Sequence, residues 1–123
     1  MAIDIYKHLE PITDGSGRVL GYQVIKDYHY FSPRYKKHVV ARTTDKPYDG
    51  ATGAIDINSY GWLIHDVLCR DGCFSDGTAC NNWQASTVLS DILKSEGRWF
   101  RARSWFVTTW LLGGGKARDN GLY

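Results

Sequence analysis

The sequence lacks any apolar run of about 18 residues, the length at which a segment becomes a candidate for crossing a membrane as a helix. Its first residues, Met1-Ala2-Ile3-Asp4, contain no basic stretch followed by an apolar one, so we expect no secretory signal peptide. Cysteine is scarce, with three residues. An odd count without a signal favours reduced thiols in a cytoplasm over a disulfide framework.

The composition is that of an ordinary globular protein. Of the 123 residues, 43% are hydrophobic and 23% are charged, which disfavours both disorder and a coiled coil. Five Trp, eight Tyr and four Phe are enough aromatic residues to form a core in a chain of this size. We therefore expect one domain.

The net charge of +2 conceals an uneven distribution. Residues 1–42 carry a net charge of +3 and residues 94–123 a net charge of +4, whereas residues 43–93 carry −5. All seven acidic residues of the middle block are aspartates. Short carboxylates among Gly and Asn are typical of turns and helix caps, and they also suit sites for hard cations.

The first forty residues favour β-strands. Residues 3–9 alternate with period two, and Pro11 with the loop 14–17 is expected to end that strand. Residues 20–31 are rich in aromatic and β-branched side chains, and residues 36–44 resemble a third strand. These patterns predict a short antiparallel β-meander.

The rest of the chain favours helices. Ser59 is a candidate cap for a helix through residues 62–69, and Asn82 for a second helix that stops at Gly97. A third helix is expected over residues 99–112, ended by the glycines 113–115.

The predicted fold is therefore α+β, with a short N-terminal antiparallel β-meander followed by two or three packed helices. We expect a single domain over residues 1–112, made of the meander (1–46) and a helical part (47–112). Residues 113–123 are expected to be a Gly-rich tail, with the last eight residues extended.

His65 and Asp66 on the first predicted helix form the candidate catalytic site. Neighbouring helical side chains point about 100° apart, so the two could face one cleft without bonding each other. There the imidazole could take a proton from water while the carboxylate holds a divalent cation. Carbonyls of the loop around Asp49 and Gly50 could complete the cation site, and Asp91, or more weakly Ser86, could orient the imidazole. A partly buried, purely structural His65 is the alternative.

The segments Asp49-Gly50-Ala51-Thr52 and Trp62-Leu63-Ile64-His65-Asp66-Val67-Leu68-Cys69-Arg70 resemble a small family of unknown function from tailed bacteriophages and prophages. The similarity covers about residues 38–112, and the His-Asp segment in turn resembles the helix of phospholipases A2. This resemblance implies that His65 is the base, that Asp66 binds calcium and that the loop around Asp49 and Gly50 donates carbonyls. The chain departs from these patterns at Cys69, where both families have Tyr, and at Ser86, where the phage family often has Asp.

Two other patterns concern metals and anions. His65, Cys69, Cys73 and Cys80 are conceivable zinc ligands, but their spacing lacks a tight cysteine pair, so zinc is disfavoured. Residues 94–103 combine basic and tryptophan side chains, as a surface for protein, anionic lipid or nucleic acid would. The small net charge argues against nucleic acid.

Two functions follow as hypotheses. The first is a phage-encoded accessory protein with a phospholipase-A2-like His-Asp site, acting as a calcium-assisted ester or lipid hydrolase. The second is a non-catalytic component of the virion tail or neck, or a host-interaction protein, with other phage proteins or a host protein as partners. Either would place the protein in the host cytoplasm or in the virion.

Overall fold

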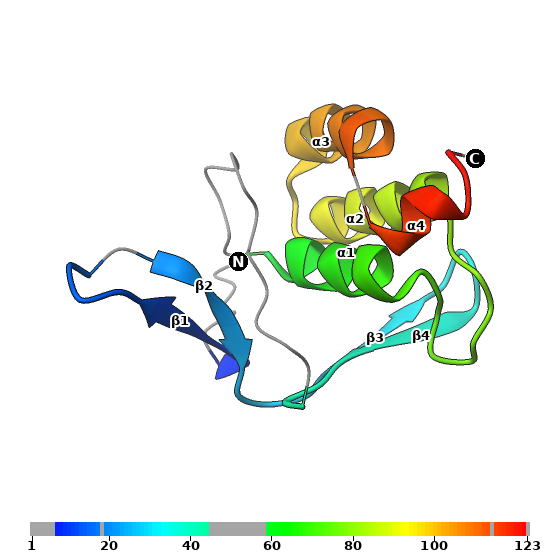
Figure 1. Cartoon of the computed structure of the whole chain (residues 1–123). Helices are drawn as coiled ribbons and strands as arrows, with labels where there is room; N and C mark the ends of the chain where they lie inside the picture. The colour runs from blue at the N-terminus through cyan, green and yellow to red at the C-terminus, as the bar shows by residue number, and fades with distance from the viewer. Residues whose placement is uncertain (1–6, 18, 45–58, 114, 123) are drawn as a thin grey trace.

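The computed structural model describes residues 7–17, 19–44, 59–113 and 115–122 (Figure 1). Strands precede helices along the chain, so the predicted α+β class is confirmed. The elements are β1 (Leu9–Thr13), β2 (Val19–Val24), β3 (Tyr28–Ser32), β4 (Lys37–Ala41), α1 (Tyr60–Asp71), α2 (Asn82–Ser95), α3 (Trp99–Leu112) and α4 (Lys116–Asp119).

The strands form two separate antiparallel hairpins, β1–β2 and β3–β4, where the sequence predicted one continuous meander. The predicted strand 20–31 is interrupted between β2 and β3. At this point the Asp27 carboxylate accepts a hydrogen bond of 2.8 Å from the backbone N–H of Thr43, which ties the link between β2 and β3 to the chain that follows β4. The β1–β2 hairpin consequently extends to one side of the helices (left in Figure 1), and β3–β4 lies beneath α1.

Pro11 was expected to end the first strand, and this prediction is wrong. Pro11 lies within β1 and is paired with Tyr22 of β2. Proline is tolerated at the edge of a sheet, where its missing N–H breaks no hydrogen bond to a partner strand. The predicted start of that strand at residues 3–6 falls outside the described residues.

The helices begin and end close to the predicted positions. The Ser59 side chain accepts a hydrogen bond of 3.0 Å from Gly61 N–H at the start of α1. Asn81, one residue before the expected cap, caps α2 and forms a reciprocal capping box with Gln84. Helix α3 has the predicted bounds, and the chain leaves it at Gly113.

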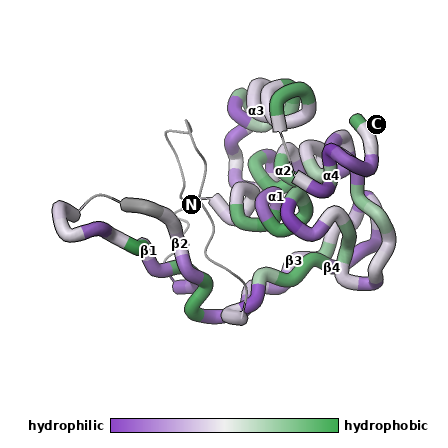
Figure 2. The backbone as a smooth tube through the Cα atoms, in the orientation of Figure 1, coloured by the Kyte–Doolittle hydropathy of each residue, from purple (hydrophilic) through white to green (hydrophobic). Residues whose placement is uncertain are grey.

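The core lies between the helices and the second hairpin. Helix α2 packs between α1 and α3, and α1 covers β4 (Figure 1). The largest fully buried side chains are aliphatic, and Figure 2 shows the corresponding hydrophobic stretches of the helices and of the second hairpin. Those contributed by α1 and α2 are Ile64, Leu68, Val88, Leu89 and Leu93. No helix among the described residues is both long and apolar enough to cross a membrane.

The C-terminal residues are not extended, so this prediction is also wrong. They fold back as α4, whose Ala117 is fully buried, and pack against α1. The following carbonyls of Gly121 and Leu122 accept hydrogen bonds of 3.0 and 2.9 Å from the N–H groups of Asn82 and Trp83. The first N–H groups of any helix lack acceptors within that helix, so the tail binds where α2 needs acceptors.

Candidate functional site

His65 lies on the inner side of α1 and is only 6% exposed. Its ring meets the Trp62 ring edge-on, with 6.2 Å between centroids. The Cys69 sulfur, one helical turn further on, is 3.5 Å from Nε2 and 3.8 Å from Nδ1. The Asp66 carboxylate is 4.0 Å from Nδ1. The structure thus brings His65 and Asp66 together, with a thiol as the nearest hydrogen-bonding neighbour.

The protonation of His65 follows from these neighbours. Burial works to lower its pKa, because desolvation disfavours the charged imidazolium. The acceptors Asp66 and Cys69 outweigh burial and raise the pKa of His65 to about 9. At neutral pH the ring is therefore charged, and it would have to lose a proton before it could act as a general base.

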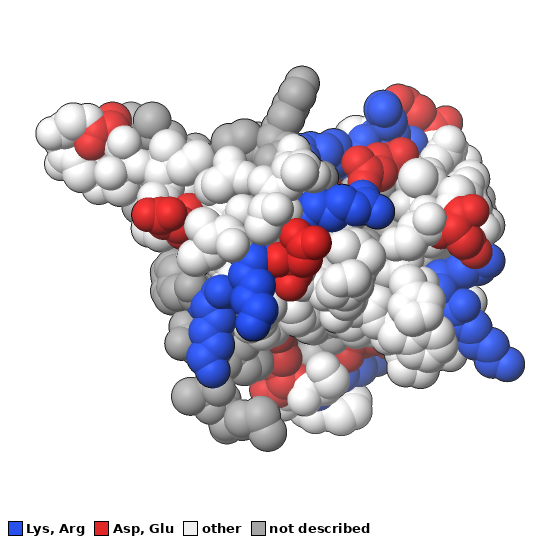
Figure 3. Space-filling view, turned by 90° about the horizontal axis from the view of Figure 1, so that it is seen from below, with Lys and Arg blue, Asp and Glu red and all other residues white. Residues whose placement is uncertain are grey.

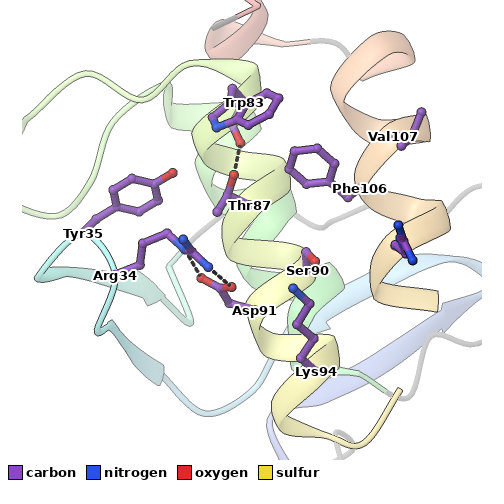
Figure 4. A pocket seen from close by; sticks show the side chains of 10 residues that line it. Arg34, Tyr35, Trp83, Thr87, Ser90, Asp91, Lys94, Phe106 and Val107 are labelled. Carbon is purple, nitrogen blue, oxygen red and sulfur yellow. Dashed lines mark hydrogen bonds and ion pairs between the residues drawn. The ribbon is translucent and has the colours of Figure 1, made fainter. Parts of the chain in front are cut away.

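Asp91 is not brought to His65. Its carboxylate accepts two hydrogen bonds from the Arg34 guanidinium, of 2.8 and 2.9 Å, on the opposite side of α2 from α1 (Figure 4). The weaker candidate Ser86 instead exchanges a hydrogen bond of 2.7 Å with Thr109 of α3. Ser86 and Asp91 are five residues apart on α2, so their side chains point about 140° from each other. The helical period therefore directs them to different neighbours, Thr109 and Arg34. Asp49 and Gly50 lie outside the described residues.

The three cysteines are free thiols. Cys80 is fully buried, and burial followed by the proximity of Cys69 and Cys73 raises the pKa of its thiol to about 12. Over the described ranges, no three or more His, Cys, Asp or Glu side chains are grouped so that they could hold a metal ion.

A groove of about 390 Å³ lies between α2, α3 and the turn that joins β3 to β4 (Figure 4). Aromatic rings form part of its wall, since Trp83 meets Phe106 edge-on at 4.9 Å between centroids. Ser90 lies further along α2, near Asp91 and Lys94, and is 6% exposed, and its hydroxyl has no hydrogen-bond partner within the described part of the chain. The groove therefore combines apolar walls with an unused hydroxyl.

The groove is also positively charged. Arg34, Lys94 and Arg103 line it, and Asp91 is the only carboxylate among its lining residues. Because Arg34 neutralises Asp91, the charges of Lys94 and Arg103 are left unmatched by any ion pair among the described residues. By contrast, the face seen from below carries acidic and basic side chains side by side (Figure 3).

Sequence reasoning noticed the basic residues near α3 but missed the groove. Arg34 and Asp91 are 57 positions apart, and no local pattern relates them. The alternation of Trp83, Thr87 and Ser90 on one face of α2, at helical spacing, was the only available signal.

Compared with known proteins, the chain matches no protein-family model, no curated protein and no solved structure.

Proposed function

We propose that this protein is a non-catalytic binding module, an accessory protein of a bacteriophage, whose groove between α2 and α3 holds an acidic segment of another phage protein or of a host protein. The observation that carries the proposal is the pair of unmatched cations, Lys94 and Arg103, beside aromatic walls.

Charge complementarity selects the occupant. A glutamate or aspartate side chain entering the groove would meet Lys94 and Arg103 with no repulsion from Asp91, whose charge Arg34 already matches. The Ser90 hydroxyl offers the same carboxylate a hydrogen bond. A basic segment would meet only repulsion from the two cations.

Trp83 provides the apolar contact. It is partly exposed, while its ring is held edge-on by Phe106 and by Trp110, each at 4.9 Å between centroids. Tryptophan and arginine are enriched among the residues that dominate binding energies, and a ring already fixed in place loses little entropy on binding. A partner segment with an aromatic or aliphatic side chain next to its acid would use both features.

The proposal can be tested with labelled copolymers of glutamate and tyrosine as model acidic partners. Fluorescence anisotropy should show that the glutamate–tyrosine copolymer binds to the wild-type protein. A labelled lysine–tyrosine copolymer should show no binding. The double variant Lys94→Glu/Arg103→Glu should bind the acidic copolymer at least about tenfold more weakly. The matched control is Lys7→Glu/Lys26→Glu, which changes the net charge equally at exposed positions outside the groove.

Two outcomes would contradict the proposal. Absence of binding to the wild-type protein would remove the acidic occupant. Equal loss in the groove variant and the control would mean that net charge alone attracts the copolymer. Trp83→Ala adds a second test, because its loss of binding cannot come from a change in charge.

A calcium-assisted hydrolase is the second candidate, since His65 and Asp66 do lie together on α1. Among the described residues Asp66 is the single predicted calcium ligand, so they assemble no calcium site by themselves. The test is fatty-acid release from vesicles of phosphatidylglycerol and phosphatidylethanolamine, with calcium or with chelator. Release that requires both calcium and His65, and is lost in His65→Gln, would replace the binding module with an enzyme.

A further inference from the structure

Helix α3 has a second apolar stripe that faces away from the protein. Phe100 is 85% exposed, Val107 49% and Leu111 46%. With 100° per residue these three positions fall within an arc of about 40°. Ala102 and Thr109, the buried residues of α3, lie on the opposite side of the helix. The stripe is therefore turned away from the buried side of α3, and its Val107 also belongs to the lining of the groove.

The surroundings of the stripe are basic. Helix α3 contains Arg101 and Arg103 and no acidic residue. On the helix these arginines flank the middle of the stripe, Arg103 about 60° away on one side and Arg101 about 100° away on the other. Lys94 adds positive charge at the N-terminal end of α3, whereas Arg98 lies 4.0 Å from the Glu96 carboxylate, which offsets its charge. The Lys94 ammonium lies over the Trp99 ring, 5.8 Å from its centroid. Burial lowers the pKa of Arg98, and the nearby positive charge of Arg101 lowers it further.

Large apolar side chains mark both ends of the same helix. Trp99 at the start and Leu112 at the end are mostly exposed, as is Phe100 beside Trp99. Tryptophan and phenylalanine next to basic residues are typical of helices that lie at the boundary between headgroups and acyl chains. Helix α3 has 14 residues and is about 21 Å long, which suits a helix lying flat on a surface.

We infer that α3 binds the surface of an anionic lipid bilayer, with Phe100, Val107 and Leu111 inserted among the headgroups and Arg101 and Arg103 against lipid phosphates. This inference goes beyond the proposed function, although the two surfaces share Val107 and Arg103, which also line the groove. Phe100, Leu111 and Arg101 lie outside the groove, so variants at these positions test the lipid surface separately. The burial of the three side chains supplies the apolar contribution, and the flanking arginines select the sign of the surface charge.

Charge complementarity also separates a lipid surface from a second copy of this chain. Two α3 helices packed along their stripes would bring arginines together with no carboxylate on either helix. A lipid surface replaces this repulsion between arginines with attraction to phosphates, which the long arginine side chains can reach while the stripe is inserted.

The experiment is co-sedimentation of the full chain with vesicles, in the presence of chelator so that calcium-dependent chemistry does not contribute. We expect binding to vesicles of equal parts phosphatidylglycerol and phosphatidylcholine, and none to phosphatidylcholine alone. Phe100→Ser/Leu111→Ser should weaken binding at least about tenfold, because two inserted apolar side chains are lost. Arg101→Glu, which lies outside the groove, should weaken it by about tenfold and make the remainder less sensitive to salt.

The matched control is Phe31→Ser, a change of equal chemistry at an exposed phenylalanine of β3 (47% exposed) away from α3. It should bind vesicles like the wild type, and circular dichroism should show all variants folded. Failure of the wild-type protein to bind, or equal binding by the stripe variant, would overturn the inference. Light scattering supplies the other outcome: a dimer that dissociates in the stripe variant, together with no vesicle binding, would make the stripe an interface between copies.

Discussion

Asn82 offers the sharpest test of how α2 and α3 are held together. Its side chain is fully buried, and its Nδ2 amide group donates to the carbonyls of Thr109, Trp110 and Gly113, at 3.3, 2.8 and 3.2 Å. These carbonyls belong to the C-terminal end of α3, which a helix cannot satisfy by itself. We expect Asn82→Ala to destabilise the protein because it removes the donor that ties this end to α2.

The magnitude follows from which carbonyls keep another donor. Thr109 O also accepts from the N–H of Gly113, at 2.9 Å, and Gly113 O also accepts from Arg118, at 3.0 Å. The loss therefore falls mainly on Trp110 O, whose bond is the shortest of the three. One lost hydrogen bond and one poorly satisfied carbonyl cost about 2–3 kcal/mol in the free energy of unfolding. The Asn82 Oδ1 has no partner among the described residues, so its removal offsets part of this cost.

Asn82→Asp provides the contrast. It keeps the shape but turns the donor into a second acceptor facing the same carbonyls, so it should cost more than Asn82→Ala. Burial would raise the pKa of the introduced carboxyl above its value in the unfolded chain. Relative to the wild type, the variant should thus be least destabilised below about pH 4, where the introduced carboxyl is protonated in both states, and it should lose stability as the pH rises above that value.

The assay is urea unfolding followed by circular dichroism, with thermal unfolding beside it. Asn82→Ala should lower the melting temperature by roughly 6–12 °C at neutral pH. A change within about 0.5 kcal/mol of the wild type would refute the argument, because such a change is typical of surface positions. So would an Asn82→Asp variant as stable as Asn82→Ala at neutral pH.

Three further expectations concern stability. Gly115 has φ 92°, and a Cβ there would lie 2.5 Å from the Cys69 carbonyl oxygen, so Gly115→Ala should cost about 2 kcal/mol or more and loosen the C-terminal tail, as measured by unfolding and by limited proteolysis. The pKa of His65 is raised to about 9, so the stability that its protonation contributes is fully present below about pH 6.5 and is lost as the pH rises through 9. The free energy of unfolding, measured against pH, should therefore change less in His65→Gln than in the wild type across that window. Thr109→Val should cost about 1–2 kcal/mol, because its buried hydroxyl bonds a serine of α2 at 2.7 Å, whereas Thr108→Val, with a hydroxyl exposed on the same helix, should change the unfolding midpoint little.

The helices could be predicted because their signals are local. Ser59 caps the first helix as expected, and the third has its predicted bounds, 99–112. The cap of the second helix was misplaced by one residue, since Asn81 and Asn82 are both good caps by composition. Only the tertiary structure distinguishes them: Asn81 bonds the helix start, while Asn82 is drawn into the contact with α3.

The strand errors have a different cause. Pro11 and the run 20–31 were interpreted by composition, which describes a strand but not its neighbours. Whether a proline interrupts a strand depends on which edge its nitrogen faces, and whether a run stays straight depends on contacts such as Asp27 with Thr43. Both are decided by residues distant in sequence.

The candidate sites divide in the same way. The sequence by itself placed His65 beside Asp66, because adjacent residues on a helix must be neighbours, and it also determined that α3 is basic and free of acid. It could not decide that Asp91 belongs to Arg34, that the tail folds onto α2, or that the third helix has an apolar face turned outward. Those outcomes depend on how the helices rotate about their axes when they bury the largest apolar area, and this rotation is a property of the packed chain as a whole.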